Sequence, residues 1–397
     1  MDILKIKNEF LKYYGGSAED IRIFKSPGRV NLIGEHTDYN GGYVFPAALT
    51  MGTTIALRPN GENIVRMRVT DLPDFVEADI SDLYRDEYKN LRWGNYQIGV
   101  LIELQKLGYN IVGCDMLYED TLPHGGGLSS SAAIEVSTAL AFAKLSNEKN
   151  GITEPVDMIK MAYCGQSAEH NFCGVNCGIM DQFASAMGKK DHAIFLDCKN
   201  MNYELVPFKI DGYKIIMTNT NKKHSLASSK YNERRSECER GFEYLKKAIP
   251  SASCLGDITP CQFEDHKHLI EDPTVLRRVT HVIYEDDRVL KSIDALKLGD
   301  IKAFGKLMNA SHDSLRDLYE VTGIELDTLV EEARKIPGVL GSRMTGAGFG
   351  GCSVSIVKNE NTEEFKEKVA EAYTKKIGYA PSFFVDEPGN GGMELKD

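Results

Sequence analysis

A glycine-rich segment that leads directly into an apolar helix constrains this chain more than any other part of its sequence. Three consecutive glycines, Gly125, Gly126 and Gly127, allow positive φ angles and let the backbone approach a ligand closely. Serines follow at positions 129–131, and apolar residues then recur at steps of three and four, which predicts a helix with one buried face. The start of such a helix offers unpaired N–H groups and the positive end of its dipole, so we predict a phosphate-binding loop.

The glycines alone do not establish this prediction, because glycine-rich turns precede many helices only to reverse the chain. The chain has no G-x-x-x-x-G-K-[ST] loop, and the segment lacks the G-x-G-x-x-G spacing of dinucleotide-binding proteins. The three serines favour the phosphate interpretation. Their hydroxyls can cap the helix, but three together can also bind a metal ion or a phosphate oxygen.

The length of the chain, 397 residues, indicates two domains, since one typical domain has roughly 150 residues. The composition changes near Pro207, where a pair of predicted strands within 192–208 ends. We therefore predict an N-terminal domain over residues 1–205 and a C-terminal domain over residues 206–397.

The balance of charge excludes some classes of partner. A net charge of −11 and a pI near 5.4 provide no basic field for a nucleic acid or an anionic membrane surface. No run of residues approaches the ~20 apolar residues that cross a bilayer, and the charged N-terminus does not resemble a signal peptide. Nine scattered cysteines without a C-x-x-C pair suggest neither a disulfide framework nor a zinc site. We expect a cytoplasmic protein with small-molecule substrates and no obligate protein partner.

A second informative segment, residues 21–57, begins as a strand and continues into a polar loop punctuated by glycines. Polar groups on such a loop are usually solvated. Here a guanidinium, two carboxylates, an imidazole and an amide supply both donors and acceptors, as neighbouring sugar hydroxyls require. The segment therefore predicts a polyol-binding site. These side chains are Arg29, Glu35, His36, Asp38 and Asn40.

Periodicity predicts the remaining elements. Residues 3–14 have the spacing of a short amphipathic helix, and Thr153 and Pro155 mark another helix start. Alternation predicts that Cys352, Val354 and Ile356 form a strand with one buried face, after a third glycine-rich loop at 341–351. Further strands are expected at 53–57, 64–69 and 213–218, and helices at 225–247 and through much of 275–335.

Three single residues allow two interpretations each. Trp93 is either core filler or a surface on which a base stacks. Glu169 continues an apolar helix face, and either Mg²⁺ or a structural arginine would satisfy it. Asp181 follows a glycine turn at a helix start, where the helix dipole alone favours an acid. The sequence around these residues does not decide between the interpretations.

Together, the three glycine-rich loops resemble the three motifs of the GHMP small-molecule kinases, in the same order and spacing. The segment Gly-Arg-Val-Asn-Leu-Ile-Gly-Glu-His-Thr-Asp-Tyr-Asn-Gly-Gly, residues 28–42, resembles the signature of the galactokinase family. The resemblance runs from about Ser26 to Asn390 and so covers nearly the whole chain. It implies an α+β, two-domain GHMP kinase fold: an N-terminal mixed sheet with helices, a ferredoxin-like C-terminal domain, and an active site in the cleft between them.

The resemblance also implies a role for each matching residue. Arg29 and Asp181 match the catalytic pair, and Ser131 and Glu169 match the Mg²⁺ ligands. The positions that hold the sugar are matched by Glu35, His36, Asp38, Gly178 and Tyr231. The ATP-binding positions are matched by Gly125, Gly126, Gly127, Leu128, Ser129, Ser130 and Ser131, and by Trp93 near the adenine.

The reaction implied is ATP-dependent phosphorylation of the anomeric hydroxyl of α-D-galactose, with Asp181 at that hydroxyl and Arg29 holding Asp181 ionised. Two alternatives remain at this point. One is a related sugar-1-kinase that acts on N-acetylgalactosamine or another sugar. The other is a regulator that binds galactose and ATP without turnover, although no DNA-binding or interaction segment supports it.

Overall fold

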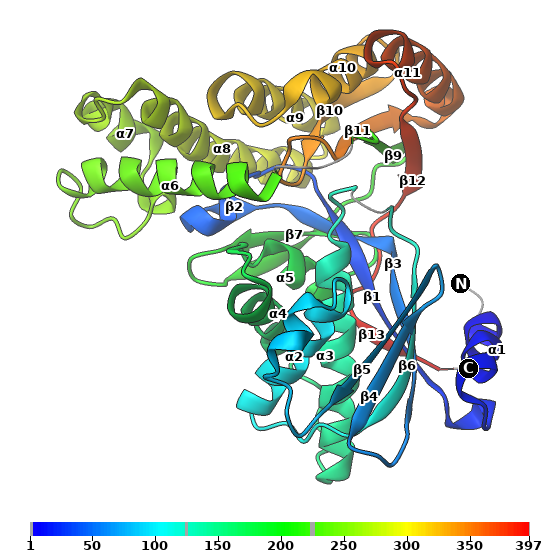
Figure 1. Cartoon of the computed structure of the whole chain (residues 1–397). Coiled ribbons are helices and arrows are strands. Elements are labelled where there is room, and N and C mark those ends of the chain that lie inside the picture. The colour runs from blue at the N-terminus through cyan, green and yellow to red at the C-terminus, as the bar shows by residue number, and fades with distance from the viewer. Residues whose placement is uncertain (1–2, 124–125, 223–226, 397) are drawn as a thin grey trace.

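The structure is a computed structural model that describes residues 3–123, 126–222 and 227–396; for residues 227–229 it describes the backbone alone. It contains a six-stranded mixed sheet with helices, a four-stranded antiparallel sheet with helices, and a three-stranded sheet (Figure 1). The predicted mixed sheet flanked by helices is confirmed. The division at 205/206 stays a prediction, and the last strand of the chain returns to the six-stranded sheet.

The six-stranded sheet has the order β13-β1-β3-β6-β4-β5. Its neighbours pair antiparallel except β4 and β6, which run parallel. The register between β1 and β3 shifts between Pro27 and Arg29, a bulge at Gly28 that re-aims the following side chain. The strands are β1 (Arg22–Asn31), β3 (Pro46–Pro59), β4 (Ile64–Val69), β5 (Leu72–Asp79), β6 (Cys114–Asp120) and β13 (Met393–Leu395).

Both faces of this sheet are covered, because side chains alternate between them. Ile23, Ala56 and Leu117 pack against helix α1, whereas Phe24 and Ile55 belong to the core that the helices on the opposite face share. Figure 1 shows α1 apart from the group formed by α2, α3 and α4. The helices are α1 (Ile3–Tyr14), α2 (Gly94–Lys106), α3 (Ser130–Lys149), α4 (Met158–Ala168) and α5 (Met180–Met187).

Two expectations about these helices were wrong. Helix α3 is buried around most of its circumference, not on one face, because α2, α4, α5 and β1 all pack against it. Helix α4 begins at Met158, after Thr153 and Pro155, because Asp157 accepts a hydrogen bond from the backbone of Lys160 and caps it.

The four-stranded sheet has the order β10-β11-β9-β12 and is wholly antiparallel. Strand β11 is buried on both faces, contrary to the prediction of one; Ser355 is accommodated by a 2.8 Å hydrogen bond with Ser342. The strands are β9 (Tyr213–Asn219), β10 (Val339–Thr345), β11 (Cys352–Lys358) and β12 (Ser382–Asp386), and the three-stranded sheet contains β2 (Tyr43–Val44), β7 (His192–Asp197) and β8 (Tyr203–Pro207).

The remaining helices lie around the four-stranded sheet and extend from it as an arm formed by α6, α7 and α8 (Figure 1). The helix predicted at 225–247 is confirmed within the described residues, which exclude Ser225. These helices are α6 (Ala227–Lys246), α7 (Pro260–His266), α8 (Pro273–Lys297), α9 (Ile301–Ser314), α10 (Gly323–Arg334) and α11 (Thr362–Ile377). Among the helices described, none combines the length and apolar character that a bilayer crossing demands.

Candidate active site

Two cavities share a wall formed by Arg29, Ser131, Asp181 and Ala347. The sugar-binding residues predicted from the sequence all line the first cavity: Glu35, His36, Asp38, Gly178 and Tyr231. The second cavity is lined by Trp93, Gly127, Ser129, Ser130 and Ser131 among others. Gly126 and Leu128 line neither of the two, and Gly125 lies outside the described residues.

Arg29 and Asp181 form a bidentate ion pair at the shared wall. Nε of Arg29 donates to Oδ1 of Asp181 at 2.8 Å, and Nη2 donates to Oδ2 at 2.9 Å. The bulge in β1 precedes Arg29, and Asp181 lies in the first turn of α5, which packs against β1. Two parallel bonds fix the orientation of the carboxylate as well as its charge. The Asp181 side chain remains 31% exposed, so a substrate can reach it.

The glycine-rich loop is attached to the same pair. Nη1 of Arg29 donates to the carbonyl of Gly127 at 2.7 Å, and Oγ of Ser129 donates to Oδ2 of Asp181 at 2.5 Å. Ser129 has φ 63° and ψ 49°, a left-handed conformation that is uncommon for residues other than glycine. Because its hydroxyl faces Asp181, Ser129 makes no side-chain cap on α3.

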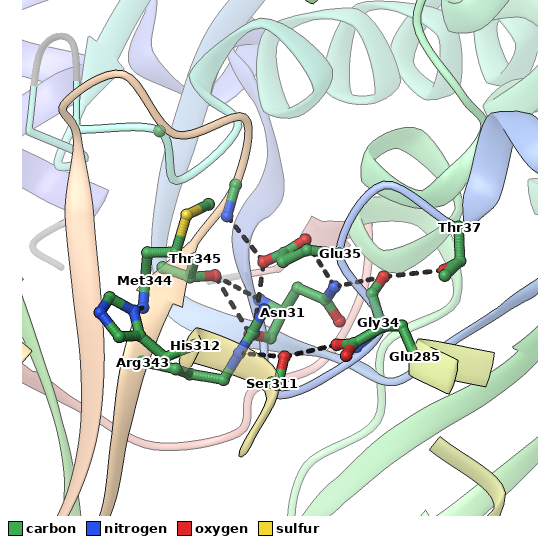
Figure 2. A network of polar contacts seen from close by, with 12 residues as sticks. Asn31, Gly34, Glu35, Thr37, Glu285, Ser311, His312, Arg343, Met344 and Thr345 are labelled. Carbon is green, nitrogen blue, oxygen red and sulfur yellow. Dashed lines mark hydrogen bonds and ion pairs between the residues drawn. The ribbon is translucent and has the colours of Figure 1, made fainter. Parts of the chain in front are cut away.

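Glu35 lies in a buried polar network that joins β1 to the third glycine-rich loop (Figure 2). Its Oε2 accepts a hydrogen bond from Asn31 at 2.8 Å, and its Oε1 accepts one from the backbone of Gly346 at 2.7 Å. Arg343, wholly buried in β10, contacts the same Oε1 at 3.4 Å and donates to the carbonyl of Asn31 at 2.9 Å. Burial raises the pKa of Glu35, and the guanidiniums of Arg343 and Arg29 oppose that shift.

His36 is a neutral imidazole held by tyrosines. Burial and the nearby His281 lower the pKa of His36 to about 3. Its Nδ1 lies 2.9 Å from the hydroxyl of Tyr39, which is 2.8 Å from the hydroxyl of Tyr319, while its Nε2 is buried without a partner among the described residues. The ring of Tyr231, from α6, lies 5.7 Å from the His36 ring. His36 therefore lines the first cavity as a neutral imidazole beside an aromatic wall.

Asp38 is another of the carboxyl groups that line the first cavity. Burial and the negative charge of Asp181 raise the pKa of Asp38 to about 7. Gly178 packs directly against it, since a Cβ at position 178 would overlap the Asp38 carboxylate. The absence of a side chain at Gly178 thus lets Asp38 occupy this place.

Glu169 and Ser131 fit a metal site that phosphate oxygens would complete. Glu169 begins a π-helical turn, Glu169–Cys173, and the buried Glu135 lies beside it. Burial and mutual proximity raise the pKa of Glu135 well above its usual range, and burial also raises that of Glu169. Two close carboxyl groups disfavour each other's ionisation, and a cation bound beside them would offset that repulsion. Within the described ranges, no three His, Cys, Asp or Glu side chains form a cluster that could hold a metal. Mg²⁺ fits this setting, because it commonly uses one or two carboxylates with substrate phosphates.

Comparison with known proteins agrees with this geometry. Residues 8–59 match the galactokinase galactose-binding signature, residues 95–189 the GHMP kinases N terminal domain, and residues 292–375 the GHMP kinases C terminal family. A galactokinase of Clostridium acetobutylicum is 48% identical, with both chains covered completely. One of Halalkalibacterium halodurans is 48% identical over 95% of this chain and 93% of its own.

The chain belongs to the galactokinase family.

The crystal structure of Lactococcus lactis galactokinase complexed with galactose superposes with a TM-score of 0.92 at 39% identity, covering 99% of this chain and 100% of that one. The GHMP kinase fold predicted from the three loops is therefore confirmed. Several features of this site had no signal in the sequence pattern: the contact of Ser129 with Asp181, the contact of Arg343 with Glu35, and the tyrosines behind His36. Each depends on residues that only the folded chain brings together.

Proposed function

We propose that this chain transfers the γ-phosphoryl group of ATP to the anomeric hydroxyl of α-D-galactose, giving α-D-galactose 1-phosphate and ADP. The relatives named galactokinase, and the galactose-bound structure of one of them, support this reaction. The observation that carries the proposal is the Arg29–Asp181 pair, which lies where a cavity lined by sugar-binding groups meets a cavity bordered by the phosphate loop.

In this proposal, the sugar occupies the first cavity. Carboxylates accept hydrogen bonds from hydroxyl groups, and an imidazole N–H or a tyrosine hydroxyl donates them. Because galactose and glucose differ by one epimeric hydroxyl, a site paired to that hydroxyl rejects the epimer by roughly 10⁴-fold. We assign part of this discrimination to Asp38, with Glu35 and Tyr231. The full set of proposed sugar ligands is Glu35, His36, Asp38, Gly178 and Tyr231.

The transfer step then follows from the position of Asp181. Its carboxylate accepts or orients the proton of the C1 hydroxyl, while O1 attacks the γ-phosphorus in line and ADP departs. Arg29 holds Asp181 in place and offsets negative charge on the transferring oxygens. Phosphoryl transfer depends mainly on such positioning and electrostatic stabilisation.

The nucleotide occupies the second cavity. The phosphate loop, which borders this cavity at Gly127, Ser129, Ser130 and Ser131, binds its phosphates, and Trp93 lies near its base. Ser131 and Glu169 would hold Mg²⁺, which would supply positive charge to offset that of the phosphate oxygens. We also propose the cytoplasm as the location, where ATP is available; the nine free cysteines agree with a reducing compartment.

Release of ADP measured across a panel of sugars tests the proposal. We expect turnover with galactose and at least 10³-fold lower kcat/KM with glucose. Preference for N-acetylgalactosamine would instead identify a related sugar-1-kinase, and binding of galactose and ATP without ADP release would identify a regulator. Asp181→Asn is expected to lower kcat by about 10²- to 10⁴-fold if Asp181 is the general base. Near wild-type turnover of that variant would exclude the role.

A further inference from the structure

Gln97 is a fully buried amide without a hydrogen-bond partner. It lies in helix α2, has none of its surface exposed to solvent, and lines the second cavity. Neither Nε2 nor Oε1 meets a partner among the described residues. Because native proteins pair nearly all buried polar groups, an unpaired amide that borders a cavity indicates a ligand that completes it.

Two more unpaired polar atoms border the same cavity. The indole Nε1 of Trp93 and the hydroxyl of Thr53 are both buried without a partner in the described part of the chain. The apolar residues that line the same cavity include Val69, Leu72 and Ile134. A cavity with apolar walls and a few polar groups suits a flat heteroaromatic ring whose edge carries donors and acceptors. The sugar does not have this chemistry, whereas the base of a nucleotide does.

We propose that Gln97 recognises the adenine base of the nucleotide and sets the base preference of the enzyme. A glutamine amide presents one acceptor beside a donor group, and adenine presents its 6-amino group beside a ring nitrogen that accepts. Oε1 of Gln97 accepts from the 6-amino group, and Nε2 donates to the adjacent ring nitrogen. The inference rests on the proposed function, because it takes the second cavity as the nucleotide site.

Gln97 and the phosphate loop border the same cavity. Helix α2 packs against α3, the helix that follows the phosphate loop, so the amide and the loop border one cavity from adjacent helices. Trp93 precedes α2 and its ring lies edge-on to that of Tyr118 at 6.2 Å. An aromatic wall beside an unpaired amide is a suitable arrangement for a stacked base with one edge hydrogen-bonded.

Binding of two nucleotides to the full chain tests the proposal without requiring turnover. Calorimetry compares ATP with purine riboside 5′-triphosphate, which lacks only the 6-amino group, for the wild type and Gln97→Met. We expect the wild type to bind ATP about tenfold or more tightly than the analogue, the effect of one lost hydrogen bond. In Gln97→Met, the two nucleotides should bind equally, because the partner of the amino group is gone.

Two further measurements separate recognition from a structural role. Gln97→Met removes an unpaired buried amide, so the melting temperature of the nucleotide-free protein should stay the same or rise, whereas loss of a structural hydrogen bond would lower it. Gln105→Met makes the same substitution in the same helix, at an exposed glutamine that bonds the carbonyl of Ile80 at 2.9 Å, and should keep the wild-type preference.

The outcomes are distinct. Equal binding of the two nucleotides by the wild type, or an unchanged preference in Gln97→Met, would overturn the assignment of Gln97. The ADP-release assay with galactose is run on the same wild-type sample. Failure of that assay would reject the proposed function, while the binding data would still decide whether Gln97 recognises the base.

Discussion

The hydroxyl of Ser129 donates a 2.5 Å hydrogen bond to Asp181 from a residue whose backbone is left-handed. Arg29 donates to both oxygens of the same carboxylate, so three protein donors surround it. The phosphate loop and the proposed base are thus one connected unit. A substitution at Ser129 should therefore change the rate of phosphoryl transfer and not only the affinity for the nucleotide.

Ser129→Gly and Ser129→Ala separate the two properties of this residue. Both variants lose the hydroxyl, but only alanine is strained at a positive φ, since glycine adopts that conformation freely. If the hydroxyl positions Asp181, both should lower kcat by about tenfold or more, as expected for a hydrogen bond to a charged group. The measurement is kcat from steady-state ADP release. Loss of activity in Ser129→Ala alone would show that the backbone conformation, not the hydroxyl, matters.

The raised pKa of Asp38 predicts how stability changes with pH. In the unfolded chain the Asp38 carboxyl has its ordinary pKa of 3.8, and in the folded protein its pKa is about 7. Between these values the folded state keeps a proton that the unfolded state has lost, so this group's contribution is full below pH 4 and is lost as the pH rises through 7. Asp38→Asn should therefore stabilise the sugar-free protein more at pH 8 than at pH 5.

Thermal unfolding of both proteins at the two pH values checks this prediction. We expect the advantage of Asp38→Asn over the wild type to grow by roughly 2 kcal/mol between pH 5 and pH 8, which is less than the full shift would give because Asp38 faces the cavity. The same variant should bind galactose more weakly, since it replaces a carboxylate acceptor. An advantage that does not change with pH would contradict the raised pKa.

Arg343 should stabilise the fold through charge. It is wholly buried and contacts Glu35, so Arg343→Met removes the cation that contacts this buried carboxylate. Breaking a buried pair in this way costs about 3–5 kcal/mol, which should appear as a lower urea midpoint. Arg316→Met, which removes a surface arginine paired with Asp317, is the matched control and should cost less than about 1 kcal/mol.

A double variant tests whether the Arg343 effect arises from the pair. Adding Glu35→Gln to Arg343→Met removes the unpaired charge, so part of the lost stability should return. If the double variant is less stable than Arg343→Met by the full cost of Glu35→Gln alone, the two side chains are not coupled.

Local patterns predicted much of the fold. The strands at 64–69 and 213–218 and the helix at 3–14 agree closely with β4, β9 and α1, because each has a clear period of its own. Patterns predicted burial less well. The serines of β11 suggested an exposed face, but Ser355 is covered and paired with Ser342 from the next strand. Whether a face is covered depends on elements distant in the sequence.

In the candidate site, too, local motifs identified some residues, whereas residues whose partners are distant in the sequence could not be identified. Asp38 and Asp181 lie in glycine-punctuated motifs and could be named from the sequence. Arg343 could not, since its partner Glu35 lies 308 residues away. Gln97 gave no signal either, because glutamine is an ordinary helix former and its missing partners can be seen only in the folded chain.

Gly178 should be required for sugar binding rather than for folding of α5. A Cβ at this position would overlap the carboxylate of Asp38, whose side chain is the mobile partner in that clash, so Gly178→Ala should displace Asp38 from the sugar cavity. We expect KM for galactose to rise about tenfold or more, as for loss of one hydrogen bond to a charged group, with KM for ATP little changed.

Gly174→Ala, at another glycine that lines the cavity, is a poor control because its φ is 74°. Gly108→Ala is no better, since its φ is 86°. The matched control is therefore Gly178→Ala combined with Asp38→Ala. Once the carboxylate is gone, the added methyl group has space, so the double variant should bind galactose no more weakly than Asp38→Ala alone. A further loss of sugar binding in the double variant would mean that Gly178 contacts the sugar directly and does not act through Asp38.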